Sequence, residues 1–214
     1  MPLRILVVSA TPAESDVLKN IDGFDLASVV TGVGTVATAW ALTRYLNSGQ
    51  RPDLAINIGI AGSYNTDIPV GEVVVPGSDC LADEGIEERS GFLTLAESGL
   101  RDPDGFPFRA GRLWADEFPV PAATESLRKV KAITVNTATG SQETIKRLSE
   151  KYNPDIETME GAAFFYVCIR EKMPFLALRA VSNLVEPRDR DKWNIPLALH
   201  NLKIKLREVL LLIN

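Results

Sequence analysis

Short apolar runs of strand length alternate with helical patterns along most of this chain of 214 residues. Ile5–Val8 is wholly aliphatic, and Leu54–Ile58 and Phe175–Val181 each contain one polar residue. Runs of this kind are typical of strands that are buried on both faces. Helical patterns follow such runs, for example at Val36–Leu46 and Ala162–Ile169. The alternation predicts an α/β fold in which helices cover both faces of a mostly parallel sheet.

The remaining segments extend this pattern through a single domain, residues 1–214. Further strands are predicted at Leu26–Val30, Val70–Pro76, Ile133–Thr137 and Asp155–Met159, and further helices at Gly140–Tyr152 and Pro196–Ile213. The segment 87–121 is dense in Gly, Pro, Asp and Arg and has no sustained period. We interpret it as an excursion from the one domain, suited to an oligomer contact or a lid.

Composition argues against several classes of function. The net charge of −5 and the pI near 5.1 do not suit a nucleic-acid surface, which needs clustered Lys and Arg. No apolar run reaches the roughly 18 residues of a membrane span, so we expect no membrane insertion. Cys80 and Cys168 lie in apolar contexts and predict buried free thiols in a reducing, cytoplasmic compartment. His200 is the single histidine, so His-based metal sites and Ser-His-Asp triads lack their main ingredient.

Polar side chains gather where predicted strands end. Glu160 lies at a strand-to-helix junction, and Glu14 lies in the first turn of a helix that begins after Thr11. The run ending at Val181 carries Arg179 and leads directly into Ser182 and Asn183. Because ligands of open α/β sheets bind outside the carboxyl ends of the strands, these groups predict an active edge.

These residue types suit the chemistry of a nucleoside. One carboxylate accepts two hydrogen bonds side by side, as a ribose diol requires, while a second one orients and deprotonates a water molecule. Taken singly, each carboxylate is also explained as a charge that stabilises a helix N-terminus. Glu157 is a third carboxylate at a strand end, without an assigned role, and Asp83 and Glu84 lie outside this set.

Six motifs resemble those of the nucleoside phosphorylase and nucleosidase superfamily, and more narrowly its methylthioadenosine/adenosylhomocysteine nucleosidase branch. They occur in order along nearly the whole chain: Ala10–Glu14, Thr31–Gly34, Asn57–Gly62, Val70–Val75, Met159–Glu160 and Arg179–Asn183. The resemblance implies a three-layer α/β/α domain with a twisted, mixed central sheet. It also implies cleavage of an N-ribosidic bond in a small-molecule nucleoside, and a homo-oligomer. The segment 87–121 is the candidate to complete a neighbour's pocket in that oligomer.

The resemblance also implies roles for individual residues. Glu160 would hold the ribose hydroxyls with Met159 beneath the sugar, and Glu14 would activate the attacking water with Arg179 nearby. Asn183 occupies the position that recognises the base. The remaining pocket residues implied by the same motifs are Ala61, Gly62 and Ser182. No motif implies a metal or an organic cofactor.

Departures from the family pattern refine the expected substrate. Nucleosidases that act on adenine-bearing substrates carry Asp at the position of Asn183; an amide donates to O6 or N7 of a 6-oxopurine, whereas a carboxylate only accepts. A phosphate-binding arginine of the phosphorylases is replaced by Asn57, and a common serine by Ile60, which favours water as the nucleophile. An aromatic residue of the nucleosidases is missing near Gly140, which leaves more room.

The segment after Asn183 resembles the futalosine hydrolases of this superfamily. That resemblance implies hydrolysis of futalosine to hypoxanthine and dehypoxanthine futalosine on a route to menaquinone. Arg188, Arg190 or Lys192 would pair with the benzoate of the substrate, and Trp193 would cover its apolar part. The alternative interpretation of this basic cluster is a solvated loop with weak internal ion pairs.

Two other functions stay open at this point. One is a different purine nucleosidase or nucleoside phosphorylase, with an inosine-type or methylthioadenosine-type substrate. The other is a non-catalytic nucleoside-binding protein. Glu14, Met159, Glu160 and Arg179 are all present, which argues against the non-catalytic alternative.

Overall fold

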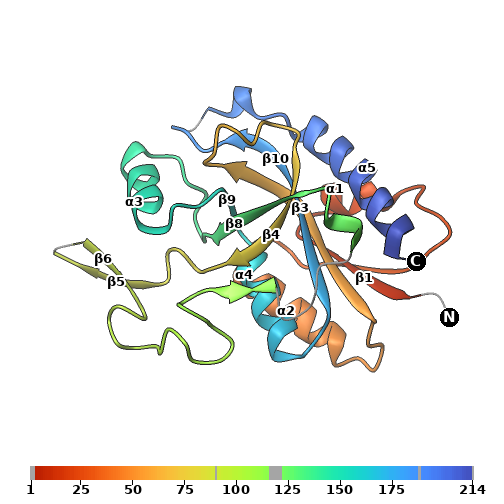
Figure 1. Ribbon diagram of the computed structural model, residues 1–214, viewed down its shortest axis with the longest axis horizontal. Helices are drawn as coiled ribbons and strands as arrows, with labels where there is room; N and C mark the ends of the chain where they lie inside the picture. Colours follow the sequence, from red (N-terminus) through yellow and green to blue (C-terminus); the bar gives the residue numbers. More distant parts are fainter. Residues whose placement is uncertain (1–2, 90, 116–121, 188, 214) are drawn as a thin grey trace.

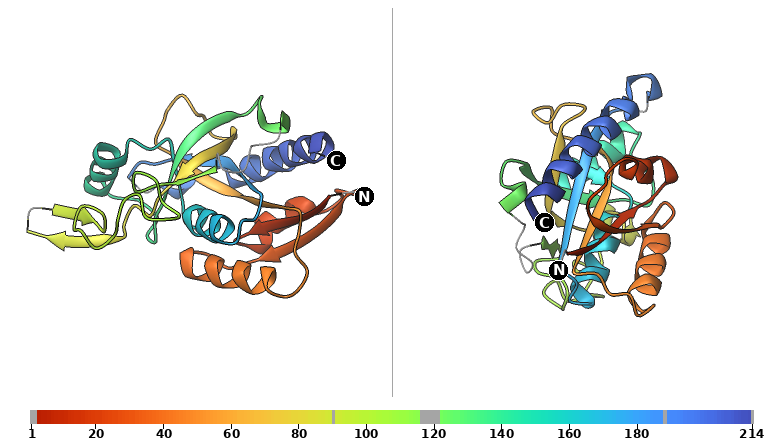
Figure 2. Two further views of the ribbon diagram at one scale, coloured as in Figure 1. Left: turned by 60° about the horizontal axis from the view of Figure 1, so that its bottom comes forward. Right: turned by 90° about the vertical axis from the view of Figure 1, so that its right-hand side faces the viewer.

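The computed structural model describes residues 3–89, 91–115, 122–187 and 189–213. A central sheet lies between helices, with α2 and α4 on one face and α5 on the other (Figures 1 and 2). The predicted α/β fold with helices on both faces of a central sheet is therefore confirmed. Within the described residues, no helix is both long and apolar enough to cross a bilayer.

The elements alternate along the chain much as the sequence predicts. The strands are β1 (Arg4–Ser9), β2 (Asp25–Val30), β3 (Leu54–Ser63), β4 (Val73–Asp79), β5 (Gly85–Glu88), β6 (Gly91–Thr94), β7 (Leu113–Trp114), β8 (Arg128–Thr134), β9 (Ile156–Thr158) and β10 (Phe175–Leu184). The α-helices are α1 (Pro12–Ser15), α2 (Thr35–Leu46), α3 (Gln142–Tyr152), α4 (Gly161–Arg170) and α5 (Ile195–Ile213). Short 3₁₀ turns lie at η1 (Asp16–Leu18), η3 (Ala122–Thr124) and η4 (Arg190–Lys192).

Strand β1 shows why the sheet needs helices on both sides. Ile5 and Val7 pack into the apolar cluster under α5, whereas Leu6 and Val8 pack into the cluster under α2 and α4. Successive side chains of a strand point to opposite faces, so a wholly aliphatic strand buries both faces. The first apolar run of the chain therefore connects the two halves of the core.

The sheet is mixed, and part of it closes on itself. β2, β1, β3 and β10 run parallel in that order, while β4 is antiparallel to β10 and β9 is antiparallel to β3. Parallel pairs β4–β8 and β8–β9 complete a circuit of β3, β10, β4, β8 and β9. A third apolar cluster draws on all five of these strands, with Ala61, Val74, Ala132, Ile156 and Val181 among its members.

Several strands differ from their predicted bounds, among them β3, which continues past its predicted end at Ile58 to Ser63. β4 begins only at Val73, because the turn before it places Gly71 at a φ of 92°, and it continues past Pro76 through a shift in register. β8 ends at Thr134, so the prediction of strand up to Thr137 was wrong. The backbone N–H of Asn136 donates to Asp83 Oδ2 at 2.6 Å instead of to a neighbouring strand. β10 extends to Leu184 and contains Ser182 and Asn183, which were expected to follow the strand.

The predicted excursion lies mostly outside the sheet. The hairpin of β5 and β6 projects from the body beside α3 (Figure 1). Lys151 of α3 forms an ion pair with Glu97 at 2.6 Å, and the Arg147 guanidinium lies over the Phe92 ring. Among the described residues of this segment, only those of β7 return to the main sheet, where β7 pairs with β4. Residues 116–121 of this segment lie outside the described part of the chain.

A buried carboxyl group supports the start of α4. Asp79 has no exposed surface, and its Oδ1 accepts hydrogen bonds from the Cys80 N–H at 2.7 Å and the Thr134 hydroxyl at 3.0 Å. The same Thr134 oxygen accepts the Ala162 N–H at 2.8 Å, which satisfies one of the unpaired donors at the helix N-terminus. Burial raises the pKa of Asp79 to about 7, against the opposing charge of Arg112.

Gly161 is expected to tolerate no side chain, because a Cβ at this position would lie 2.2 Å from Asp79 Oδ2 and 2.9 Å from Thr158 Oγ1. The substitution Gly161→Ala should lower the free energy of unfolding by about 2–3 kcal/mol through overpacking. Chemical denaturation measures this loss. Gly77→Ala is the matched control, since its nearest neighbour would be the Val130 carbonyl at 3.9 Å. Equal stability of the two variants would contradict the expectation.

Candidate functional site

A cavity of about 190 Å³ lies at the carboxyl ends of β1, β3, β9 and β10. Eight of the residues singled out from the sequence line it: Glu14, Ala61, Gly62, Met159, Glu160, Ser182, Asn183 and Trp193. Arg179 lies behind this lining, in the core of the sheet, and Arg188 lies outside the described residues. Strand ends far apart in sequence therefore contribute to one pocket, as the location of ligand sites in α/β sheets predicts.

Glu14 is held by the local structure that follows β1. Thr11 caps α1. Thr11 and Glu14 form a capping box in which the Thr11 hydroxyl accepts the Glu14 N–H. Glu14 Oε2 accepts the Ala10 N–H at 3.2 Å and the N–H and hydroxyl of Thr11, both at 2.9 Å. Its Oε1 accepts the Ile60 N–H at 3.2 Å from β3. These donors fix the carboxylate at the cavity wall before any ligand enters.

Glu160 occupies the junction predicted for it, as the N-cap residue of α4 directly after β9. Its Oε1 accepts the Gly34 N–H at 2.9 Å. Gly34 has a φ of 97°, a left-handed conformation that glycine adopts without steric cost and that here belongs to the turn before α2. Burial raises the pKa of Glu160, and the charge of Glu14 adds to this effect, while the Gly34 N–H and Arg179 oppose it.

Arg179 is fully buried at 1% exposure and is held across the central strand pair. One guanidinium nitrogen donates to the carbonyls of Asn57 and Leu178, each at 3.1 Å, and the other donates to Asn57 Oδ1. The Asn57 amide in turn donates to the Val8 carbonyl at 2.9 Å, which links β1, β3 and β10. Burial lowers the pKa of Arg179, while the carboxylates of Glu160, Glu14 and Asp79 raise it.

Asn183 presents an oriented amide to the cavity. The Ser182 hydroxyl donates to Asn183 Oδ1 at 2.7 Å, and Asn183 Nδ2 donates to the Leu184 carbonyl at 3.0 Å. Because a carbonyl only accepts, the Leu184 contact assigns the nitrogen of the amide. The register of β10 against β3 shifts between Val181 and Asn183, and such bulges redirect side chains beside active sites. One N–H of the Asn183 amide remains for a ligand.

The structure adds a polar cluster to which the sequence assigned no role. Glu157 is buried and lines the cavity, together with Thr139. Its Oε2 accepts the Tyr64 hydroxyl at 3.0 Å, and its Oε1 accepts the Thr139 N–H at 2.9 Å. Burial and the charge of Glu157 both raise the pKa of Tyr64, which keeps the phenol protonated. The position of Tyr64 directly after β3 was the available signal in the sequence.

The predicted cationic cluster is placed only in part. Trp193 contributes to the cavity wall. Lys192 instead forms an ion pair with Glu186 at 2.8 Å, with its side chain 60% exposed. The side chain of Arg190, like the whole of Arg188, is outside the described structure. The contact of Lys192 is the kind of internal loop pair that the alternative interpretation of this segment expected.

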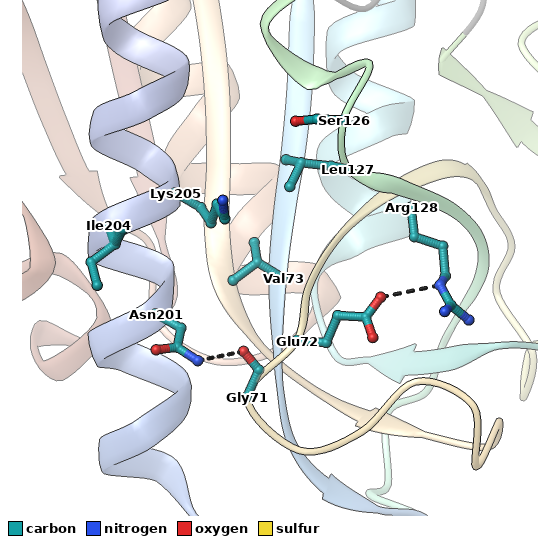
Figure 3. A pocket seen from close by; sticks show the side chains of 9 residues that line it. All are labelled: Gly71, Glu72, Val73, Ser126, Leu127, Arg128, Asn201, Ile204 and Lys205. Atoms are coloured by element: carbon teal, nitrogen blue, oxygen red, sulfur yellow. Dashed lines mark hydrogen bonds and ion pairs between the residues drawn. The ribbon is translucent and has the colours of Figure 1, made fainter.

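A second hollow lies between α5 and the turn before β4 (Figure 3). Its features are an ion pair of Glu72 with Arg128 at 3.1 Å and a hydrogen bond from Asn201 Nδ2 to the Gly71 carbonyl at 2.7 Å. The Asn201 contact ties α5 to the turn before β4, and the ion pair ties that turn to β8. Among the described residues, no three His, Cys, Asp or Glu side chains are grouped so that they could hold a metal ion.

Comparison with known proteins agrees with this geometry. Residues 17–211 match the Phosphorylase superfamily. The futalosine hydrolase of Streptomyces coelicolor is 34% identical over 186 residues, which cover 83% of this chain and 74% of the relative. Two solved structures share the fold at low identity. A methylthioadenosine/adenosylhomocysteine nucleosidase from Colwellia psychrerythraea, in complex with adenine, gives a TM-score of 0.80 at 18% identity, over 100% of this chain and 96% of the other. A futalosine hydrolase of Helicobacter pylori gives 0.78 at 16%, over 98% and 97%.

The match to the superfamily extends over most of the chain, and the Streptomyces relative exceeds 30% identity over most of its own length. The chain therefore belongs to the Phosphorylase superfamily, on the branch of the futalosine hydrolases.

Proposed function

We propose that this protein hydrolyses the N-ribosidic bond of a 6-oxopurine nucleoside, and that its substrate is futalosine. The products are then hypoxanthine and dehypoxanthine futalosine, in a step of menaquinone biosynthesis. The observation that carries this proposal is the shared cavity of Glu14, Glu160 and Asn183. It brings a base for water, an acceptor for ribose and a donor for the purine into one site.

Glu14 is the base for the attacking water. The carboxylate is held by four hydrogen bonds, three of them on Oε2, so Oε1 is the better placed oxygen for an additional donor. A fixed acceptor orients the water without reorganising when the bond to the base breaks. Gly59 matters here, because a Cβ on it would lie 2.8 Å from Glu14 Oε1.

Glu160 and Asn183 act on the two parts that separate. Glu160 accepts hydrogen bonds from ribose hydroxyls, and its charge stabilises the positive charge that develops on the sugar in an oxocarbenium-like transition state. The Asn183 amide donates to O6 or N7 of the purine and withdraws electron density from the departing base. Arg179, buried behind the cavity wall, favours the ionised form of Glu160.

Internal contacts support water, and not phosphate, as the nucleophile. Asn57 is occupied by Arg179 and by the Val8 carbonyl, and the Ile60 N–H is occupied by Glu14. Neither residue offers the cationic or hydroxyl ligand that a phosphate ion prefers. At these two positions the site therefore has no available donor with which to bind a phosphate ion.

The remaining parts of the proposal concern the 5′ end of the substrate and its setting. Trp193 covers the apolar part of the 5′ substituent, and a cation of the segment 188–192 pairs with its benzoate, with Arg188 as the first choice. Residues 1–214 work as one nucleosidase-like domain in the cytoplasm. The buried free thiols of Cys80 and Cys168 support a reducing compartment.

The substrate is tested by a chromatographic assay of the purified protein with futalosine, inosine and methylthioadenosine, each with and without phosphate. We expect release of hypoxanthine from futalosine at a rate that phosphate does not change. Adenine release from methylthioadenosine as the main activity would overturn the base assignment. Phosphate-dependent cleavage of inosine would overturn the hydrolytic step.

The role of Glu14 is tested with Glu14→Gln, which keeps the shape of the side chain but removes its capacity to take a proton. We expect kcat for futalosine to fall by about 10²–10⁴-fold, the usual contribution of general acid–base catalysis. Glu125→Gln, an exposed position outside the cavity, should leave kcat unchanged. A thermal unfolding curve separates lost chemistry from lost fold, and a folded Glu14→Gln enzyme with wild-type kcat would exclude Glu14 as the base.

The proposed homo-oligomer has a candidate surface on α2 and the turn before it. Val33, Val36 and Trp40 are apolar and exposed, at 56%, 83% and 63%, and Val33 also lines the cavity. A partner on this surface, with segment 87–121 as the candidate contact, would complete the pocket wall. Sedimentation should show an oligomer, which Trp40→Glu dissociates by burying a charge in an apolar interface. A monomeric wild-type protein would disprove this part of the proposal.

A further inference from the structure

We propose that Glu157 determines which purine is accepted, by taking the N1–H of a 6-oxopurine base in a hydrogen bond. Asn183 donates to the neighbouring O6 or N7, so the two side chains together recognise one edge of the base. This inference rests on the proposed function, because it assumes that the cavity holds a purine nucleoside. It adds a specificity residue that the superfamily motifs did not supply.

Position is the first support for this assignment. Glu157 of β9 lies opposite Gly62 of β3 in the antiparallel pair. A Cβ on Gly62 would lie 3.3 Å from Asn183 Nδ2 and 3.6 Å from Glu157 Cγ, so both side chains converge over this glycine. All three residues line the cavity. The carboxylate is therefore a neighbour of the amide that is assigned to the base, on the same part of the wall.

The hydrogen bonds of Glu157 leave it able only to accept. Its two oxygens accept the Tyr64 hydroxyl and the Thr139 N–H, at 3.0 and 2.9 Å. The raised pKa of Tyr64 keeps its proton on the phenol, so the Tyr64 hydroxyl donates to Glu157. A carboxylate has roughly four lone-pair sites, so one acceptor site per oxygen remains. A ligand that meets Glu157 must bring a donor.

The amide of Asn183 has the opposite character. Its oxygen lies 2.7 Å from the Ser182 hydroxyl, and one of its N–H groups donates to the Leu184 carbonyl. The second N–H is the donor that it can offer a ligand. The wall of the cavity therefore presents an acceptor and a donor side by side, each with its orientation set by protein contacts.

This pair matches hypoxanthine and rejects adenine. Hypoxanthine carries a donor at N1 and acceptors at O6 and N7, whereas adenine carries an acceptor at N1 and a donor at its 6-amino group. With adenine the N1 lone pair would face the Glu157 carboxylate. The Thr139 N–H, a cavity-edge donor that could have served N1 of adenine, is already bonded to Glu157. Unpaired buried polar groups make such mismatches costly, and sites of this kind discriminate strongly.

The test is Glu157→Gln, assayed with inosine or futalosine and with the matching adenine nucleoside. Tyr64 and Thr139 donate to different oxygens of Glu157 and an amide has a single oxygen, so its NH₂ group replaces one of the two acceptors that the carboxylate presents. We expect the ratio of kcat/KM for the 6-oxopurine over the 6-aminopurine to fall at least about tenfold, the effect of one misplaced hydrogen bond. Glu150→Gln, an exposed carboxylate of α3, is the matched control and should keep the wild-type ratio.

Binding of free bases to the wild-type protein gives a second measurement that does not depend on the variant folding. By calorimetry, hypoxanthine should bind at least about tenfold more tightly than 1-methylhypoxanthine, which lacks the N1 proton. Two results would overturn only the role of Glu157 and leave the proposed function in place. One is equal binding of these two bases, and the other is an unchanged kcat/KM ratio in a folded Glu157→Gln enzyme that still cleaves futalosine. A wild-type enzyme that prefers adenine nucleosides would overturn the proposed function together with this inference.

Discussion

The buried guanidinium of Arg179 is the interaction on which the rest of the site depends. A charge with 1% exposure is tolerated only when it is hydrogen-bonded and neutralised, and Arg179 obtains both conditions from different strands. Asn57 of β3 supplies two oxygen acceptors, and the carboxylates of Glu14 and Glu160 supply compensating charge. Removing either partner strand would leave this charge unpaired, so the pairing of β3 with β10 and the electrostatics of the cavity form one arrangement.

The second constraint is that each functional side chain is fixed by backbone groups near it. Glu14 is held by the capping box at the start of α1, and Glu160 is held by the N–H of Gly34. Asn183 is held by the residues on either side of it in a bulged strand. Contacts of this kind cost little entropy on substrate binding, because the side chains are already ordered. The cavity is thus prepared for a planar base and a sugar by the strand ends, and the helices mainly cover the sheet behind it.

Much of this could be predicted from the sequence, because the signals are local. The aliphatic run of β1, the strand-to-helix junction at Glu160 and the cap of α1 all follow from patterns within a few residues. The closure of β3, β10, β4, β8 and β9 could not be predicted, since it depends on long strands that change partners halfway along. The bond between Asn57 and Arg179 and the cluster around Glu157 join residues distant in sequence, so no periodicity reports them. The early end of β8 likewise depends on Asp83, a side chain from another segment.

The distance along the chain between Asn57 and Arg179, 122 residues, has a consequence for synthesis. While the protein emerges from the ribosome, β3 is complete long before β10 exists, and its aliphatic face must wait for the strand that covers it. Non-local parallel pairing of this kind forms slowly and exposes apolar surface in the meantime. The last strand to be made thus unites the core and the pocket in a single late event, and a nascent chain that stalls before residue 175 would have neither.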